Sequence, residues 1–404
     1  MSRLLFTGAA EVVTSAGGSD AAVQSGSAVL VDGGRVLEVA PQADLAARAP
    51  DARRVDCAGG LITPGFVDSH THAVFGGWRA AEYALRSRGV PYMEIARRGG
   101  GINASVRDTR ARSEEELVEL ARRRLDSTMR MGTTTVEIKS GYGLDTATEL
   151  KQLRVVRRLQ ADLPLTLVPT FLGAHEFPPE YRTDRDRYTD LLVEAMIPAV
   201  AAEGLARFCD VFMEPGVFTA AQTRRVLEAG LAHGLVPKLH ADELENSGAA
   251  ELAVEMGAAS ADHLGAVSEA GIAALASSTT VATLLPTTLL FLGKTAYAPA
   301  RRLIDAGANV ALATDFNPGS SPSPNMALVL TLACSVMGMD PLEAIVAATA
   351  GGARALGLDD GTGTLVPGSP ADIALWDIDS HLELPYRLGT PPLLGVWKAG
   401  IRVV

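Results

Sequence analysis

Five of the seven histidines in this chain follow short apolar segments, and the first two of them could share a metal ion. His70 and His72 form the sequence His-Thr-His after the first of these segments. Residues i and i+2 of a strand point the same way, so these two imidazoles are expected on one side. The other three, each after a later segment, are His175, His240 and His263. We interpret His233, in a helix end, and His381, near the C-terminus, as structural.

His240, His263 and Asp315 could supply further donors of a candidate metal site. With His70 and His72 they make a mixed nitrogen and oxygen set with an open position for water, which suits catalytic Zn²⁺ or Fe²⁺. Each residue also has a structural interpretation, because His-x-His alone is a weak signal. His240 and His263 could be buried hydrogen-bonded histidines, and Asp315 could begin a helix. Their common place at the ends of apolar segments favours the metal site.

Glu243 lies three residues after His240 and is the candidate proton carrier. A carboxylate beside a water held by a metal is well placed for general acid and base work. The alternative is a solvated glutamate at a helix start, since the sequence HADELENSGAAELA soon becomes helical in pattern.

Two side chains near glycines are candidates for binding the substrate. Arg79, in FGGWRAAEY, could form a fork for a carboxylate, or could be a surface arginine at a helix start. Tyr142 lies between two glycines, which let a backbone approach a ligand, or it could be a capping aromatic. The sequence RRGGGIN at 97–103 lacks the Gly-Lys-Ser/Thr of a phosphate loop, and we interpret it as a mobile lid. We find no serine nucleophile motif and no cysteine near a base.

Eight apolar, β-branched segments alternate with helical patterns through the middle of the chain, which predicts a (β/α)8 TIM-like barrel. A doubly wound sheet is the alternative. In a barrel the ends of the strands that carry the histidines form the catalytic face. The expected strands are 65–72, 133–140, 165–175, 208–216, 235–243, 260–264, 281–286 and 310–316. The expected helices include one opened by a Ser113–Glu116 capping box, and others at 219–234, 327–338 and 340–357.

Both ends of the chain have a β pattern that the middle lacks. The sequence SAVLVDGGRVLEV is typical of two strands joined by a Gly-Gly turn. We therefore expect residues 1–60 and 361–404 to form one small β-sandwich domain, and residues 61–360 to form the barrel.

Composition sets the class of protein. The chain has 404 residues, 47% of them hydrophobic and 21% charged, which is typical of a globular protein. The net charge of −11 disfavours a nucleic-acid or anionic membrane surface. Residues 270–293 carry no charge, but their Ser, Thr and Pro content indicates a helix end, a turn and a buried strand. Three sparse cysteines and the absence of a signal-peptide pattern favour a cytoplasmic protein that does not span a membrane.

These motifs together resemble the metal-dependent amidohydrolase superfamily over essentially the whole chain. The resemblance rests on PGFVDSHTH, on His240, His263 and Asp315, and on ATAGGARALGLDDGTGTLVPGSPADIALWD. Longer stretches are similar to the imidazolonepropionase family within it. They are HTHAVFGGWRAAEYALRSRGVPYMEIARRGGGI, EIKSGYGL, PTFLGAHEFPPEY, CDVFMEPGVF, KLHADEL, SADHL and LATDFNPGSS. Met213 and the Thr287–Thr288 pair depart from the family's pattern, and none of them is an expected ligand.

The resemblance implies roles for named residues. One divalent or trivalent metal ion, zinc or iron, would bind His70, His72, His240 and Asp315. The substrate would contact Arg79, Tyr142, His175, Glu243, Asn317, Gly319 and Ser320, the last three on the product side. Glu243, His263 and Asp315 would be catalytic. Relatives with two metals use a bridging lysine on the fourth strand, and FCDVFMEPG has none, so a single ion is expected.

The family reaction would be the hydrolysis of the cyclic amide of 4-imidazolone-5-propanoate to N-formimidoyl-L-glutamate, in histidine degradation, by a metal-activated water. The expected partner is this small anionic substrate, and the expected assembly is a homodimer. One alternative is a cytosine- or guanine-type aminohydrolase on the same site, for which a carboxylate-binding Arg79 has no use. A more remote alternative is a catalytically silent barrel that acts as a scaffold.

Overall fold

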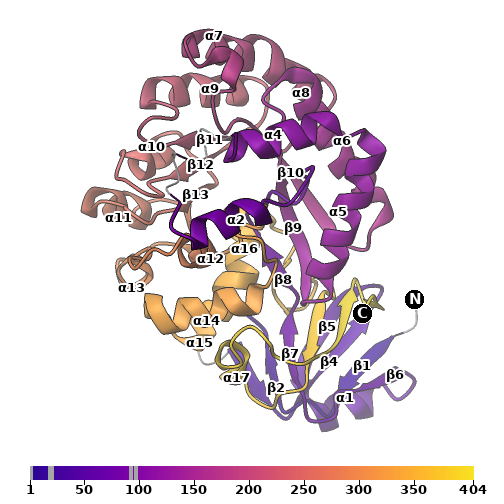
Figure 1. Ribbon diagram of the computed structural model, residues 1–404. Coiled ribbons are helices and arrows are strands. Elements are labelled where there is room, and N and C mark those ends of the chain that lie inside the picture. Colours follow the sequence, from indigo (N-terminus) through magenta and orange to yellow (C-terminus); the bar gives the residue numbers. More distant parts are fainter. Residues whose placement is uncertain (1–2, 17–21, 91–93, 95–98) are drawn as a thin grey trace.

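A parallel barrel of eight strands forms the middle of the chain in the computed structural model, which describes residues 3–16, 22–90, 94 and 99–404 (Figure 1). Strands that follow one another in the chain are neighbours in the sheet, from β8 to β15. A parallel bridge between Thr71 and Phe316 joins the first strand to the last. The predicted (β/α)8 barrel is therefore confirmed, and the doubly wound sheet is not formed.

All eight expected strands are present, and most are shorter than the sequence segments. They are β8 (Phe66–Asp68), β9 (Thr133–Lys139), β10 (Thr166–Ala174), β11 (Phe208–Met213), β12 (Val236–Ala241), β13 (Ser260–His263), β14 (Val281–Leu284) and β15 (Val310–Leu312). Most candidate site residues lie just beyond these ends, in loops that the strands hold in place.

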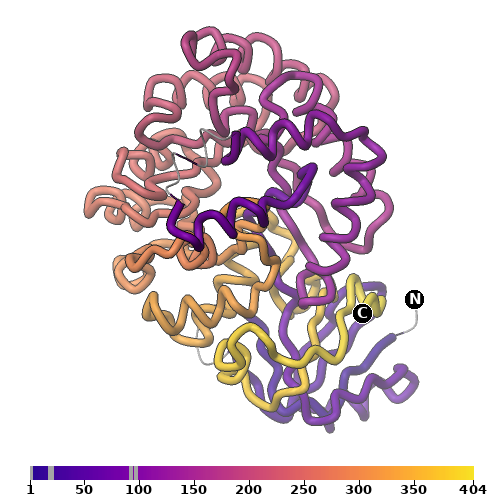
Figure 2. The backbone as a smooth tube through the Cα atoms, in the orientation of Figure 1, coloured from indigo at the N-terminus to yellow at the C-terminus, as the bar shows by residue number. Residues whose placement is uncertain are grey.

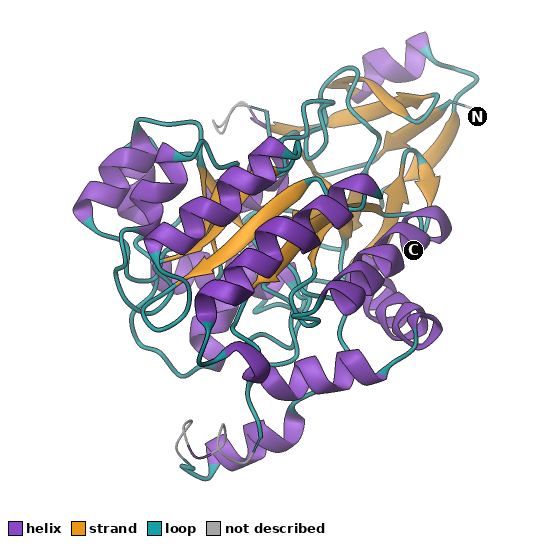
Figure 3. Ribbon diagram, turned by 90° about the horizontal axis from the view of Figure 1, so that it is seen from above, coloured by secondary structure: helices purple, strands orange, loops and turns teal. Residues whose placement is uncertain are grey.

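Helices surround the barrel (Figures 1 and 3). Those of the first half are α2 (Ala80–Ser87), α4 (Ile102–Ala111), α5 (Glu114–Met129), α6 (Thr146–Asp162), α7 (Arg185–Leu191) and α8 (Ile197–Ala202), with the short turns η2 (Pro179–Tyr181) and η3 (Leu192–Met196). Those of the second half are α9 (Ala220–Ala232), α10 (Ala249–Glu255), α11 (Glu269–Ala276), α12 (Pro286–Phe291), α13 (Ala300–Asp305), α14 (Met326–Met337), α15 (Pro341–Val346) and α16 (Gly352–Ala355).

Local sequence explains where two of these helices begin. The hydroxyl of Ser113 accepts the N–H of Glu116, whose carboxylate accepts the N–H of Ser113, so α5 opens with the predicted capping box. Thr219 and Gln222 form the same arrangement at α9. The expected helix at 340–357 is interrupted by a π-helical turn, η4 (Ala347–Gly351). This turn packs against β8 and β15, where Gly352 lies directly against the carbonyl of Val67.

Two sheets built from both ends of the chain lie beside the barrel, and indigo and yellow segments mix there in Figure 2. One sheet has the order β5-β4-β1-β6 and the other β18-β17-β16-β7-β2-β3. Phe6 of the first packs edge-on against Trp397 of the second at 5.1 Å, in a core shared by both sheets. The two sheets therefore form the expected β-sandwich.

The strands and helices of this sandwich follow the chain's two ends. From the N-terminus they are β1 (Leu4–Thr7), β2 (Glu11–Val13), β3 (Val23–Ser25), β4 (Ser27–Asp32), β5 (Arg35–Pro41), α1 (Gln42–Arg48), β6 (Arg53–Asp56) and β7 (Leu61–Pro64). From the C-terminal part they are β16 (Ile373–Trp376), α17 (Glu383–Tyr386), β17 (Leu393–Lys398) and β18 (Ile401–Arg402). Because β7 pairs with β2 and β16, residues 61–64 belong to this sheet and not to the barrel sheet. The division at residues 60 and 361 stays a proposal.

The uncharged stretch at 270–293 contains the end of α11 and the buried strand β14, as the sequence indicated, and also α12, which the sequence analysis did not predict. Among the described residues, no helix is both long and apolar enough to cross a membrane. The expected lid at 97–103 lies partly outside the described residues, since residues 97 and 98 fall there, and α4 begins at Ile102.

Candidate metal and substrate site

Three histidines from two strands meet at the carboxyl end of the barrel. Ligand nitrogens of His70, His72 and His240 all lie within 4.8 Å of one another, and all three side chains are buried. Within the described part of the chain, this is the one group of three or more such donors close enough to hold a metal ion.

Asp315 brings an oxygen to the same place from the end of β15. Its Oδ1 lies 3.6 Å from His70 Nε2 and 3.5 Å from His72 Nε2. Its Oδ2 accepts a 2.6 Å hydrogen bond from the hydroxyl of Thr288. Burial raises the pKa of Asp315 to about 6, while the bond from Thr288 opposes that shift. One of the two threonines that depart from the family's pattern therefore orients a candidate ligand.

Several buried imidazole nitrogens at this centre lack a hydrogen-bond partner. His70 Nε2, His240 Nε2 and His263 Nε2 accept or donate no hydrogen bond although they are fully enclosed. Unpaired buried polar atoms are rare, and a cation would satisfy several of these at once. Burial lowers the pKa of His70 and His72 well below the usual range, so both imidazoles are neutral and able to act as ligands. The residues present fit a single bound metal ion.

The backbone is strained where the strands deliver these side chains. His263 has φ of 80°, Asp315 of 51° and Asp242 of 49°, in the left-handed region that non-glycine residues seldom adopt. Such strain is found where surrounding structure dictates a functional conformation. The side chains of His263 and Asp315 line the cavity, whereas that of Asp242 accepts backbone N–H groups at the start of α10.

Glu243 lies in an irregular loop and not at a helix start. Its Oε2 is 3.8 Å from His263 Nε2, and its side chain is 12% exposed. The carboxylate of Glu214 accepts the N–H groups of Glu243, Leu244 and Glu245, and so fixes this loop. Burial, with the nearby charges of Asp315 and Glu214, raises the pKa of Glu243 to about 8. It can therefore carry a proton near neutral pH, as an acid must.

His175 stacks on His72, and Tyr142 lies tilted against both of these rings. The His175 ring lies parallel to that of His72, 5.0 Å away, and the Tyr142 ring is 5.5 Å from His175. Glu149 holds the Tyr142 loop by accepting the N–H groups of Gly141, Gly143 and Leu144. Burial lowers the pKa of His175 to about 3, so this ring is neutral.

Arg79 lies at the far side of the same cavity and is largely buried, with 16% of its side chain exposed. Glu82 holds its guanidinium through Nε and Nη2, both at 3.0 Å. Its Nη1 lies against Gly319, where a methyl group in place of hydrogen would clash. Asn317 shapes that loop, because its Oδ1 accepts the N–H groups of Gly319 and Ser320. The surface interpretation of Arg79 is therefore wrong.

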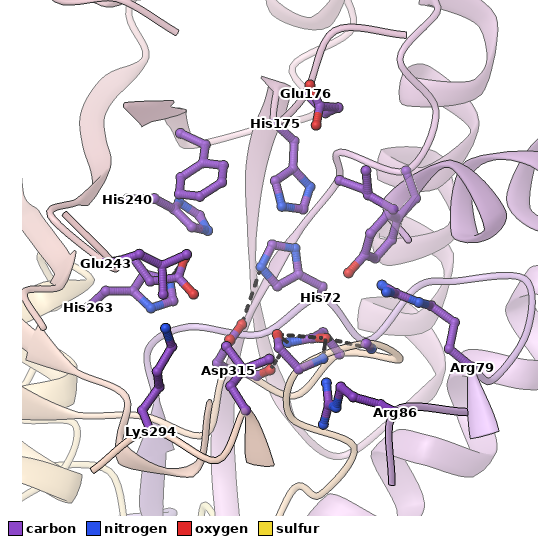
Figure 4. A pocket seen from close by; sticks show the side chains of 18 residues that line it. His72, Arg79, Arg86, His175, Glu176, His240, Glu243, His263, Lys294 and Asp315 are labelled. Atoms are coloured by element: carbon purple, nitrogen blue, oxygen red, sulfur yellow. Dashed lines mark hydrogen bonds and ion pairs between the residues drawn. The ribbon is translucent and has the colours of Figure 1, made fainter. Parts of the chain in front are cut away.

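One cavity of about 400 Å³ connects these groups (Figure 4). Every candidate site residue from the sequence lines it except His70, which lies fully buried beneath. The other two histidines are elsewhere, with His233 ending α9 and His381 bound to Glu11.

Comparisons with known proteins agree with this geometry. The model of the amidohydrolase family matches residues 61–403. An imidazolonepropionase of Symbiobacterium thermophilum is 50% identical, over 99% of this chain and 97% of its own length. One from Myxococcus xanthus is 52% identical, over 93% of this chain and 89% of its own.

The chain belongs to the imidazolonepropionase family of amidohydrolases.

Solved structures show that the family's barrel is shared more widely. An adenosine deaminase from Xanthomonas campestris with bound zinc has a TM-score of 0.73 at 22% identity, covering 99% of this chain and 92% of its own. A 5-methylcytosine deaminase from Klebsiella pneumoniae has a TM-score of 0.73 at 17% identity, covering 100% and 98%. At this identity the likeness concerns the fold alone.

The cavity of this family member also contains charged residues that the sequence analysis missed. Arg86, Glu176 and Lys294 line it, and the cationic ends of Arg86 and Lys294 point into it in Figure 4. Arg86 is held by the carbonyl of Phe291 and by that residue's ring, 4.8 Å from its centre. The cavity therefore has cationic side chains beside its carboxyl groups, and these cations favour an anionic group on the ligand in a chain of net charge −11.

A second missed group lies below the histidines, inside the barrel. Five fully buried charged side chains contact one another there, and they come from strands β9, β11, β12 and β13. They are Glu137, Lys139, Asp210, Lys238 and Asp262. The signal in the sequence was a charged residue in the middle of an apolar segment, as in TTTVEIKS and LVPKLH. Such residues are almost never fully buried unless they are paired.

Proposed function

We propose that this chain hydrolyses 4-imidazolone-5-propanoate to N-formimidoyl-L-glutamate, a step of histidine degradation. The observation that carries the proposal is a single cavity with the histidine and aspartate cluster on one side and Arg79 on the other. A cyclic amide that bears a propionate has its reacting carbonyl and its carboxylate at two ends. It therefore needs catalytic groups on one side of the cavity and a carboxylate-binding group on the other. The activity named for the relatives that are about half identical supports the same substrate.

One metal ion, zinc or iron, would be held by His70, His72, His240 and Asp315, and such an ion supplies a Lewis acid that lowers the pKa of water. The chain's own contribution is to present three imidazoles and one carboxyl group in a buried place, and burial keeps His70 and His72 neutral by lowering the pKa of both.

Protons are handled by the residues around this centre. Asp315 accepts a proton from the attacking water, and His263 holds the water and stabilises the developing negative charge on the carbonyl oxygen. Glu243 delivers a proton from its carboxyl group to the ring nitrogen as the carbon–nitrogen bond breaks. The nitrogen then leaves as a neutral group, and the carbonyl carbon becomes a carboxylic acid. This acid gives its proton to the ionised Glu243 and becomes a carboxylate, and Asp315 releases its proton to solvent. The raised pKa of Glu243, about 8, suits it to this acid role.

The propionate of the substrate binds Arg79, whose guanidinium is already oriented by Glu82. Tyr142 and His175 form the wall against which the ring lies. A bound ring is thereby held with its carbonyl carbon toward His263 and its nitrogen toward Glu243, which are close together.

We infer further that the reaction takes place in the cytoplasm. We also infer that the protein binds neither nucleic acid nor a membrane, and the net charge of −11 supports this second inference. The homodimer stays a prediction. Helix α14, one candidate for its interface, is mostly buried within the chain.

The test is to incubate the purified chain with freshly made 4-imidazolone-5-propanoate, follow the loss of substrate absorbance with and without a chelator, and measure metal per chain. We expect turnover that the chelator abolishes, with about one ion per chain. Inactivity with metal bound would contradict the substrate and point to a purine or pyrimidine aminohydrolase. Inactivity and no binding of added Zn²⁺ or Fe²⁺ would contradict the ligand set.

A further inference from the structure

Lys139 is the centre of the buried charged cluster beneath the histidines. Its ammonium lies 2.8 Å from Glu137 Oε1, 2.7 Å from Asp210 Oδ2 and 3.5 Å from Asp262 Oδ2. None of these side chains is exposed. Burial alone would lower the pKa of Lys139, but the three carboxylates outweigh burial and raise it, so the ammonium stays charged.

Two of these carboxylates contact candidate metal ligands. Asp262 Oδ2 lies 2.7 Å from His70 Nδ1, and Asp210 Oδ2 lies 3.0 Å from His240 Nδ1. A carboxylate at Nδ1 favours the tautomer with the proton on that nitrogen. The other nitrogen, Nε2, is then a free lone pair in both imidazoles, and both Nε2 atoms are unpartnered.

Lys238 closes the cluster on the other side. Its ammonium lies 3.2 Å from Glu137 Oε1 and donates to the carbonyl of Ser69, next to His70, at 3.1 Å. Within the cluster, Lys139 is the cation that contacts both of the carboxylates that lie against a histidine Nδ1.

We propose that Lys139 is a positioning residue for the metal ion: by holding Asp210 and Asp262 in place, it fixes His240 and His70 with Nε2 turned toward the shared centre. The inference rests on the metal site of the proposed function. It predicts that Lys139 acts on metal affinity although it touches neither the ion nor the substrate. Loss of a partner of this kind weakens metal binding by about 10- to 100-fold in other sites.

The experiment measures the Zn²⁺ dissociation constant of the full chain, stripped of metal, by competition with a chromophoric chelator. We expect Lys139→Met, which keeps the length of the side chain but removes its charge, to weaken Zn²⁺ binding by about 10- to 100-fold. Lys398→Met is the matched control, because Lys398 pairs with Asp372 in the β-sandwich and should leave Zn²⁺ affinity unchanged.

A spectroscopic measurement separates positioning from general stability. With ¹⁵N-labelled histidine, the metal-free wild type should show His70 and His240 protonated at Nδ1, and Lys139→Met should show a mixture of tautomers. If Lys139 only stabilises the barrel, the melting temperature falls while Zn²⁺ affinity and tautomers of the folded fraction stay as in the wild type. That result would overturn the proposal.

A second variant keeps the test valid if Lys139→Met does not fold. Asp262→Asn retains the shape at His70 but replaces the carboxylate, and we expect the same loss of Zn²⁺ affinity. Unchanged affinity in this variant would also overturn the proposal. Failure of the wild type to bind Zn²⁺ would instead contradict the metal site itself, so the two failures are distinguishable.

Discussion

The guanidinium of Arg79 is held by its neighbours in a position that suits it to bind a carboxylate. Arg79 is oriented by Glu82 and enclosed by Gly319, so its remaining N–H groups have little freedom. A fork held in this way loses little conformational entropy when a carboxylate arrives. Its place on the cavity wall makes Arg79 a candidate for binding the carboxylate of a substrate.

Removal of this fork should act on substrate binding. We expect Arg79→Ala to raise KM strongly, because loss of a desolvated charge pair costs about 2–5 kcal/mol. Steady-state kinetics with 4-imidazolone-5-propanoate test this. Arg224→Ala, which removes an exposed pair with Glu255, is the control and should leave KM unchanged. A KM for Arg79→Ala close to the wild-type value would contradict the assignment.

Gly319 should be coupled to Arg79. A methyl group at this position meets Nη1 of Arg79, so Gly319→Ala is expected to displace the guanidinium and raise KM. In the double variant Arg79→Ala/Gly319→Ala, the second change should add little, because the side chain it displaces is gone. Additive effects in this double-mutant cycle would show that Gly319 acts through another neighbour.

The cysteines should be inert in the folded protein. Burial, with a smaller effect of Asp56, raises the pKa of Cys57 to about 12, and burial raises that of Cys209 still further. Below the pKa the thiol keeps its proton, and only the thiolate is nucleophilic. We expect alkylation of Cys57 to be negligible near neutral pH, to rise as the pH approaches about 12, and to be fast in denaturant. Mass spectrometry after a timed pulse of iodoacetamide checks this, and rapid labelling of Cys57 in the native chain at neutral pH would contradict it.

At the scale of elements, buried carboxylates hold the loops of the site to the strands. Glu149 fixes the loop after β9, and Glu214, just after β11, fixes the loop that follows β12. Asp242 accepts the N–H groups of Ala249 and Ala250 at the start of α10. Each loop is irregular, yet its backbone donors are satisfied, so the side chains it carries have a defined place.

Loss of one such carboxylate should affect turnover more than binding. In Glu214→Ala the N–H groups of residues 243–245 lose their acceptor, so Glu243 moves from its place beside His263. A misplacement of about 1 Å can cost on the order of 100-fold in rate. We expect kcat to fall by this order while KM, set by Arg79 on another element, changes little. Glu255→Ala on α10 is the control, and a rise in KM with unchanged kcat would contradict the role of Glu214.

The sequence predicted elements better than it predicted contacts. Apolar runs and capping residues depend on neighbours in the chain, and this is why the eight strands and the start of α5 could be predicted. The pairing of Lys139 with Asp210 joins residues that are 71 positions apart, and no local pattern encodes it. The same holds for Thr288 and Asp315, which are 27 positions apart. The candidate ligands could be recognised only because their types are rare and their motifs are specific.

At the scale of the whole molecule, the candidate ligands span the seam where the barrel closes. His70 and His72 follow β8, whereas Asp315 follows β15, and a single bridge joins the two edges beyond the strands. The carboxylate of Asp68 accepts the N–H and the hydroxyl of Thr314 across the same seam. A cation bound here would add bonds between the first and last strands.

Metal removal should therefore lower the stability of the entire barrel. An ion that binds the folded chain alone stabilises it by about 4 kcal/mol at a free concentration of roughly 1,000 times its dissociation constant. We expect a chelator to lower the melting temperature by several degrees and added Zn²⁺ to restore it. Differential scanning calorimetry with and without the chelator measures this. An identical melting temperature in both states would contradict a site that joins the two edges.

The seam also has a consequence for how the protein is made. Asp68 and Thr314 are 246 residues apart, so the two halves of the ligand set are synthesised far from each other in time. A nascent chain that ends before β15 holds an incomplete ligand set, and its early histidines stay exposed to any metal in the cell. All four candidate ligands would come together only after the last strand has docked. An ion bound to all four ligands would therefore be present only in chains whose last barrel strand has been synthesised and has folded.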